Sequence, residues 1–367
     1  MQQVNAAVAA GTWPVAPYAS LYSWGLNTSG QLGLGDTTNR SSPNQIGLLT
    51  NWLNISAGYF HTLSNTTNKA LWSWGKNSVG QLGLGNITYY SSPKQIGSLS
   101  NWLNIAYSFE HSIAVKTDGT LWSWGLNNNG QLGLGNTTNY SSPKQVGALT
   151  TWLNVSGGRY HTVAIKTDGT LWTWGANSSG QLGIGNTTSY SSPKQVGSST
   201  DWYKVAAGRF HTISIKTDGT LWSWGINNFG QLGLNNTTNY SSPNQVGALT
   251  TWLNITSRYF QTIATQTNNT LWTWGINNFG QLGLGNISYY SSPKQVGSLT
   301  TWYKIATGRF HAAAIKTDGT LWSWGRNTNG QLGIGNTTNY SSPRQVGSLT
   351  NWLSLACGGY HTVAGKI

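Results

Sequence analysis

Histidine is the side chain in this sequence best suited to metal binding or acid–base catalysis, because imidazole ligates metals and titrates near neutral pH. Six copies of an internal repeat carry a histidine at one position, and a further copy has Gln261 there. The histidines are His61, His111, His161, His211, His311 and His361. No repeat supplies the set of cysteine or carboxylate ligands that a metal site needs, and equivalent positions of different repeats lie far apart around a ring. The pattern predicts structural histidines and no metal site.

Carboxylates are scarce, and no two of them form a recognisable acid–base pair. The seven are Asp36, Glu110, Asp118, Asp168, Asp201, Asp218 and Asp318, and four of these precede glycine in an expected hairpin turn. No serine occupies a nucleophile-elbow context. The recurring Gly-Gln-Leu-Gly block lacks the helix and the Lys-Ser/Thr pair of a phosphate-binding loop. We therefore expect no catalytic residue, no cofactor and no enzymatic activity.

The elements that position these side chains repeat every 50 residues without insertion or deletion. The pair Trp-Gly occurs seven times at the same spacing, from Trp24-Gly25 to Trp324-Gly325, and each pair is followed by Gly-Gln-Leu-Gly. A fixed period of this length indicates a repeat architecture. Most repeated residues then build the repeat, so function is to be sought where the copies differ.

One repeat, residues 205–254, predicts four short strands and no helix. Residues 211–216 alternate polar and apolar, which is typical of a half-buried strand. Asp218-Gly219 predicts a hairpin turn with positive φ at both central positions. Residues 220–225 form the return strand, rich in aromatic residues. Pro243 suits an edge strand, where its missing N–H costs little.

Four antiparallel strands repeated seven times predict an all-β fold, a seven-bladed β-propeller. Residues 18–50 hold only the second half of a repeat, and residues 351–367 hold only the first half. Pairing these halves would close the ring and remove its exposed edges. A solenoid would instead need capping repeats, which are absent from the sequence. We expect a propeller over residues 18–367 and an N-terminal arm over residues 1–17, either disordered or docked on a partner.

The repeat resembles that of the regulator of chromosome condensation family. Residues 208–233 carry the motif, with Gly-Arg-Phe-His-Thr, Thr-Asp-Gly-Thr-Leu-Trp-Ser-Trp-Gly and Gly-Gln-Leu-Gly at matching spacing. The resemblance implies a seven-bladed propeller that acts as an interaction platform. Family members include a nucleotide-exchange factor on chromatin, a plant ultraviolet-B photoreceptor and a secreted bacterial β-lactamase inhibitor. The photoreceptor places its light-sensing tryptophans at a motif position where this sequence has none.

Charged residues make up only 7% of the chain, yet the net charge is +13. One basic set adjoins the Ser-Ser-Pro of the outer loops and comprises Arg40, Lys94, Lys144, Lys194, Lys294 and Arg344. A second set precedes the hairpin turns and comprises Lys116, Lys166, Lys216 and Lys316. Neither forms a dense patch, so we interpret both as solvated rims and expect no direct nucleic-acid binding.

The best candidates for partner binding follow the glycine of the Gly-x-x-His motif. The repeat fixes the neighbours of this position, whereas the position itself varies among aromatic residues, arginine and one glycine, Gly359. Aromatic residues and arginine are enriched at interface hot spots. The candidates are Tyr59, Phe109, Arg159, Arg209, Tyr259 and Arg309, together with Arg258 from the copy that departs most from the repeat. The alternative is a packing position tolerant of long side chains.

We expect a non-enzymatic binding module, with a phage or viral structural protein as the first hypothesis. Low charge, neutral polar loops and the N-terminal arm favour a virion component that binds a capsid or tail protein, a copy of itself, or a host surface glycan. No segment is apolar enough to span a membrane, and the N-terminus does not read as a signal peptide. The alternatives are an intracellular regulator that binds a small GTPase or chromatin, and a secreted enzyme inhibitor. Cys357 is the only cysteine, which excludes an intrachain disulfide.

Overall fold

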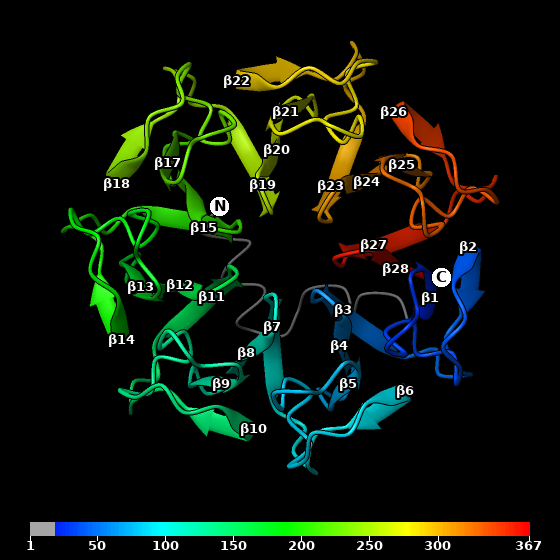
Figure 1. Ribbon diagram of the computed structural model, residues 1–367, viewed down its shortest axis with the longest axis horizontal. Helices are drawn as coiled ribbons and strands as arrows, with labels where there is room; N and C mark the ends of the chain where they lie inside the picture. The colour runs from blue at the N-terminus through cyan, green and yellow to red at the C-terminus, as the bar shows by residue number, and fades with distance from the viewer. Residues whose placement is uncertain (1–18) are drawn as a thin grey trace.

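The computed structural model describes residues 19–367, which form 28 strands arranged as seven four-stranded antiparallel sheets around a central axis (Figure 1). The all-β propeller predicted from the repeat is confirmed. Within the described range there is no helix long and apolar enough to cross a membrane. The predicted arm, residues 1–17, lies outside the described residues.

Each sheet, or blade, runs outward from the axis in the order of the chain, except the blade that joins the two chain ends. The innermost strands are β3 (Trp52–Ala57), β7 (Trp102–Tyr107), β11 (Trp152–Gly157), β15 (Trp202–Ala207), β19 (Trp252–Arg258), β23 (Trp302–Thr307) and β27 (Trp352–Cys357). The second strands are β4 (His61–Thr66), β8 (His111–Lys116), β12 (His161–Lys166), β16 (His211–Lys216), β20 (Gln261–Gln266), β24 (His311–Lys316) and β28 (His361–Lys366).

The outer half of each blade consists of a tryptophan-rich strand and a polar edge strand. The third strands are β5 (Leu71–Gly75), β9 (Leu121–Gly125), β13 (Leu171–Gly175), β17 (Leu221–Gly225), β21 (Leu271–Gly275), β25 (Leu321–Gly325) and β1 (Ser20–Gly25). The edge strands are β6 (Tyr90–Gln95), β10 (Tyr140–Gln145), β14 (Tyr190–Gln195), β18 (Tyr240–Gln245), β22 (Tyr290–Gln295), β26 (Tyr340–Gln345) and β2 (Arg40–Gln45). Each edge strand contains the proline, as expected where an N–H needs no partner.

The two ends of the chain complete one blade together, in the order β2-β1-β28-β27. Strands β1 and β28 pair antiparallel from Ser20 opposite Lys366 to Gly25 opposite His361. Figure 1 shows the blue N-terminal strands beside the red C-terminal ones. The prediction that two half-blades close the ring is therefore confirmed.

The second strands are buried on both faces, so the prediction of half-buried strands is wrong. Every residue of β12 is buried, because a neighbouring blade covers each side of a propeller sheet. The polar positions of such a strand are satisfied internally. In β16, Thr212 Oγ1 donates to the carbonyl of Gln181 at 2.9 Å, and Ser214 Oγ donates to the carbonyl of Lys204 at 2.7 Å. The polar–apolar alternation thus reflects hydrogen bonding between buried layers rather than a solvent face.

The hairpin turns also differ from the prediction. Only the glycine has positive φ, +76° at Gly169, and Asp168 does not. Gly169 N–H donates to the carbonyl of Lys166 at 3.0 Å. The carboxylate of Asp168 accepts from the backbone N–H of Thr170 at 2.9 Å and from its hydroxyl at 2.6 Å. Aspartate therefore stabilises the turn through its side chain rather than through a left-handed backbone.

The Trp and Gly-Gln-Leu-Gly positions that recur in every repeat join one blade to the next. Trp224 is fully buried, and its Nε1 donates to the carbonyl of Gln181 in the preceding blade at 3.0 Å. Gly183, two residues further on, lies directly against this indole. A Cβ on Gly183 would come within 2.5 Å of Trp224 Nε1. Glycine is required here because the next blade's tryptophan occupies the space of a side chain.

We expect Gly183→Ala to destabilise the ring by about 2–5 kcal/mol, through left-handed backbone strain and displacement of Trp224. Gly197→Ala is the matched control, because Gly197 also has positive φ, +58°, but an added Cβ would meet nothing within 4 Å. Only the strain of about 1–2 kcal/mol should remain in the control. Urea unfolding followed by tryptophan fluorescence measures both. Equal losses in the two variants would contradict this account of the interface between blades.

Candidate partner-binding face

The histidines form a hydrogen-bonded circuit between blades. His111 Nε2 lies 3.0 Å from Thr162 Oγ1, and that hydroxyl donates to the carbonyl of Gln131 at 2.8 Å. Because the threonine proton is engaged, His111 Nε2 must be the donor. The same type of contact links His61–Ser112, His161–Thr212, His211–Ser257, His311–Thr362 and His361–Thr62. In the copy without histidine, Gln261 Nε2 donates to the carbonyl of Gly308 at 2.9 Å.

Burial holds these imidazoles neutral. The pKa of His161 is lowered to about 3 by burial, and the same cause lowers the pKa of His111 and of His211 to about 3. A neutral, buried imidazole bonded to a hydroxyl cannot exchange protons with a substrate. Among residues 19–367 no group of three metal-ligating side chains gathers in one place. The histidines therefore contribute to blade packing, as the repeat pattern indicates.

The second lysine set is not a solvated rim, so that interpretation is wrong. Lys116 is only 5% exposed, and its Nζ lies 3.7 Å from the ring centroid of Trp122. Lys166 and Lys316 make the same contact with Trp172 and Trp322. Burial lowers the pKa of Lys116. The ammonium is retained near the surface because the indole face attracts it.

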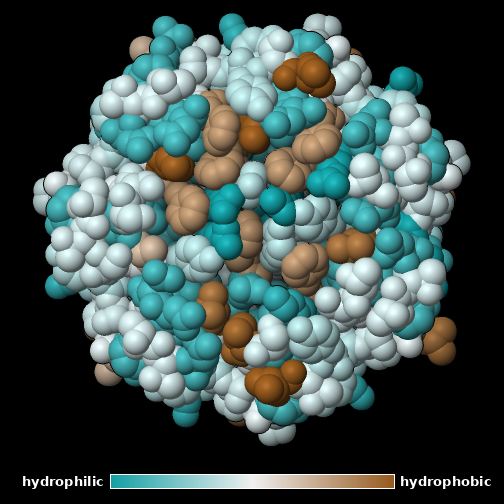
Figure 2. Space-filling view, in the orientation of Figure 1, coloured by the Kyte–Doolittle hydropathy of each residue, from teal (hydrophilic) through white to brown (hydrophobic). Residues whose placement is uncertain are grey.

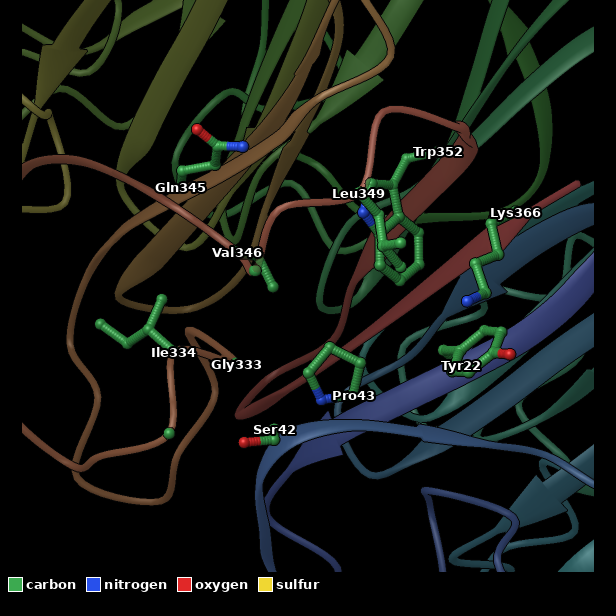
Figure 3. Close-up of a pocket in the computed structure, with 12 residues that line it drawn as sticks. Tyr22, Ser42, Pro43, Gly333, Ile334, Gln345, Val346, Leu349, Trp352 and Lys366 are labelled. Carbon is green, nitrogen blue, oxygen red and sulfur yellow. The ribbon is translucent and has the colours of Figure 1, made fainter.

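Pockets lie between neighbouring blades, near the edge strands. The pocket in Figure 3 has a volume of about 460 Å³ and is lined by Pro43, Ile334, Leu349 and Trp352, among others. Lys366 extends along one wall with its Nζ 4.4 Å from the ring centroid of Tyr22. Equivalent pockets recur between other pairs of blades. They contain no residue of the predicted partner-binding set.

The predicted candidates gather around the axis at one end of the ring, where the innermost strands turn into the second strands. We call this area the central loop surface. It comprises Tyr59, Phe109, Arg159, Arg209, Tyr259 and Arg309, the residues that follow them, Phe60, Glu110, Tyr160, Phe210, Phe260 and Phe310, and Tyr360, which follows Gly359. Figure 2 shows hydrophobic and strongly hydrophilic side chains intermixed around the middle of the ring. The six candidates at the varying position therefore form one surface.

Stacked aromatic rings and arginines build one half of this surface. Tyr59 stacks on Phe109 with ring centroids 4.7 Å apart and an interplanar angle of 19°. The guanidinium of Arg159 lies 5.5 Å from the centroid of Phe109 and 4.7 Å from that of Tyr160. Phe109 itself is 8% exposed, and the others are half-buried. These contacts hold long side chains in fixed orientations, which lowers the entropic cost of binding.

Arginines bonded to tyrosines build the other half. Arg209 Nη1 donates to Tyr259 Oη at 2.8 Å. Arg309 Nη2 donates to the same hydroxyl at 3.3 Å, and Arg309 Nη1 donates to the hydroxyls of Tyr59 and Tyr360. In residues 19–367 no carboxylate lies within ion-pair distance of Arg159, Arg209 or Arg309. The nearby acid Glu110 is paired with Lys76, at 2.6 Å. The surface therefore carries uncompensated positive charge.

Arg258 has an internal role. It is 2% exposed, and its Nη1 donates to the carbonyls of Ala57 and Cys357, each at 2.8 Å. These carbonyls end strands β3 and β27, which lie across the axis from β19 (Figure 1). A buried guanidinium that donates to these two carbonyls joins the blades at the centre and is not exposed to a binding protein. Its departure from the repeat marks a structural position.

Several residues of the surface were not predicted. Phe229 and Phe279 approach the rings of Phe260 and Phe310 at 5.1 and 5.0 Å. The guanidinium of Arg326 lies 5.1 Å from the centroid of Phe279. All three vary between repeats, which is the same signal that singled out the candidates. They were missed because their loop is distant from the Gly-x-x-His motif within one repeat and approaches it only in the folded ring.

The chain is thus a closed seven-bladed β-propeller with a fixed cationic and aromatic surface around its axis. Residues 150–364 match the RCC1-like domain. Residues 19–64, 70–115 and 118–165 match the regulator of chromosome condensation (RCC1) repeat, and residues 52–81 and 103–131 match a second profile of that repeat. The chain belongs to the RCC1 repeat family, which confirms the resemblance seen in the sequence.

Solved structures show the same fold at low sequence identity. Human WBSCR16 is 22% identical, with 95% of this chain and 98% of that chain covered and a TM-score of 0.85. Prp20p from Saccharomyces cerevisiae, characterised for its binding to Gsp1p and histones, is 20% identical, with coverage of 96% and 92% and a TM-score of 0.87. Yeast RCC1 (Prp20) bound to Kap60 gives 20% identity, 96% and 89% coverage, and a TM-score of 0.86. No curated protein matches the sequence.

Proposed function

We propose that this chain is a protein-binding regulator that holds an acidic partner surface against the central loop surface. The observation that carries the proposal is the group of arginines 159, 209 and 309, set among aromatic rings with no carboxylate within ion-pair distance in residues 19–367. Aromatic residues and arginine dominate interface hot spots. A cationic surface attracts an acidic partner and disfavours a basic one.

A small GTPase is the partner class that we place first. The yeast propeller of the same fold is known for binding Gsp1p and histones. Of these two classes, histones are basic and would be repelled by the arginines of the central loop surface. An acidic patch on a small GTPase would complement them. This favours the intracellular regulator over the other functions considered from the sequence.

The double variant Arg209→Ala, Arg309→Ala should weaken partner binding by about 30-fold or more, because two hot-spot arginines together contribute at least about 2 kcal/mol. The measurement is surface plasmon resonance against purified, GDP-loaded small GTPases from the source cell. Arg344→Ala is the control, since Arg344 is exposed on the edge strand β26 and contacts only the ring of Tyr340 among the rings described, at 4.9 Å. An unchanged affinity in the double variant, or tighter binding to duplex DNA than to any GTPase, would contradict the proposal.

A virion component is the second candidate, and it rests on composition. Charged residues are only 7% of the chain, and the loops are rich in asparagine, threonine and serine. Quantitative mass spectrometry of purified particles, cell-free medium and cytosol separates the two candidates. A fixed ratio to a capsid or tail protein in particles supports this one, and recovery in the cytosol supports the regulator.

A further inference from the structure

The hydroxyl of Tyr259 brings two positive charges together. Arg209 Nη1 and Arg309 Nη2 donate to this single oxygen, at 2.8 and 3.3 Å, so the two guanidinium groups lie within two hydrogen-bond lengths of each other. Like charges this close repel. Neither arginine has a carboxylate within ion-pair distance in the described part of the chain. The fold thus holds a pair of cations without a counter-charge of its own.

The proton of the same hydroxyl is left for an external acceptor. A phenol offers two lone pairs and one proton, and here both lone pairs accept from arginine. Within residues 19–367 Tyr259 Oη makes no hydrogen bond as a donor. The proton must point away from both guanidinium groups, because they are donors as well. Tyr259 Oη therefore presents an unengaged proton beside two guanidinium groups on the central loop surface.

The backbone at Tyr259 is held in an unusual conformation. Its φ is +56°, whereas Phe109, Arg159, Arg209 and Arg309 at the equivalent position do not have positive φ. Strand β19 is one residue longer than the other innermost strands, because Arg258 pairs with Gln261 and extends it. Bulky residues rarely adopt positive φ, and such strain concentrates at ligand sites. This left-handed residue is the one whose hydroxyl accepts from both neighbouring arginines.

We infer that Arg209, Arg309 and the hydroxyl of Tyr259 bind a tetrahedral oxyanion, a phosphate or sulfate group. Guanidinium groups bind such oxygens through paired, charge-assisted hydrogen bonds. The group is either the free ion or a monoester carried by a partner, and the second form rests on the proposed function. Phe210 and Phe260 lie beside the site, with ring centroids 5.1 and 5.4 Å from the Arg209 guanidinium carbon. They would contact the organic part of an ester.

Calorimetric titration of the full chain with inorganic phosphate and with phenyl phosphate, at constant ionic strength, tests the site. We expect one equivalent of either compound to bind. Tyr259→Phe and Arg209→Gln should each weaken binding about tenfold, because each removes one hydrogen bond to a charged group. Arg344→Gln removes the same charge from the edge strand and should leave binding unchanged. Tyr259→Phe keeps the ring and the packing, so it remains informative if Arg209→Gln lowers the unfolding temperature.

Two results would overturn the inference: no binding of either compound at millimolar concentration, or equal weakening by Arg344→Gln and Arg209→Gln, which would indicate general charge attraction. Tighter binding of phenyl phosphate supports an esterified group on a partner, and equal affinities support the free ion. If phosphate binds as expected while the alanine double variant keeps its protein partner, the oxyanion site stands and the proposed function fails. If the alanine double variant loses its protein partner and neither compound binds, the proposed function stands and the oxyanion site fails.

Discussion

Lowering the pH below about 6.5 is expected to unfold the ring cooperatively, because the buried histidines resist protonation in the folded state only. The pKa of His61, His161 and His311 is lowered to about 3 by burial. An exposed histidine titrates near 6.5. Between these values the unfolded chain binds protons that the folded chain cannot, so stability is fully present above pH 6.5 and falls as the pH drops towards 3.

The expected effect is large because six histidines act together. Each contributes about 1.4 kcal/mol per pH unit below its unfolded pKa, so six contribute about 8 kcal/mol per unit. A domain with a total stability of about 5–15 kcal/mol should then unfold roughly one to two pH units below 6.5. The aspartates act later, since hydrogen bonds from Thr170 lower the pKa of Asp168 below its ordinary 3.8.

The pH dependence of the urea midpoint measures the number of protons taken up. His161→Gln is a matched variant, because Gln261 already occupies this position in one blade and is bonded to main-chain carbonyls. It should reduce the proton uptake on unfolding by about one. A ring that remains folded at pH 4 with an unchanged urea midpoint would show that the imidazoles are not the acid-sensitive groups.

The fold could be predicted from the sequence because each blade is specified by the same local signals. The period, the Asp-Gly turns and the half-repeats at the ends all indicate one closed ring. What the sequence did not indicate is which faces are covered. Thr212 and Ser214 look solvent-facing in a single strand, yet both are buried and bonded between layers. Their burial depends on neighbouring blades, and no local pattern records it.

The position of the candidate surface was predicted from the sequence, but the contacts between its side chains were not. Variation at one motif position identified Tyr259, Arg209 and Arg309, which do meet. Departure of one copy from the repeat selected Arg258, whose side chain turns inward across the axis. Arg258 and Tyr259 are adjacent in the chain, yet Arg258 is buried and Tyr259 is only half-buried. Sequence spacing places residues on a blade and leaves the direction of a long side chain open.

Removal of residues 351–367 is expected to abolish cooperative folding. The deletion takes away β27 and β28, whose loss leaves the inner edge of β1 unpaired from Ser20 to Gly25, with only β2 still beside it. Trp24 would lose Trp352, whose ring centroid lies 6.1 Å away, and their shared core of Val346, Cys357 and Ala364 would be broken. Each large side chain contributes about 1.5–3 kcal/mol on burial, so the total approaches the stability of a whole domain. The open edge would also promote aggregation. Loss of the sharp urea transition and of a monomeric elution volume would show this.

A circular permutant separates closure from chain order. Ile367 and Ser20 correspond to Thr167 and Thr170 of the hairpin in another blade, so an inserted Asp-Gly between Ile367 and Ser20 rebuilds that turn and replaces residues 1–19. New ends at Gly97 and Ser98 fall in an exposed connection, where chain breaks are tolerated. Because the permutant keeps every strand, we expect its stability to lie within about 1 kcal/mol of the parent chain. A permutant that fails to fold, or a truncated chain that keeps its cooperative transition, would mean that pairing of the two ends is not what stabilises the ring.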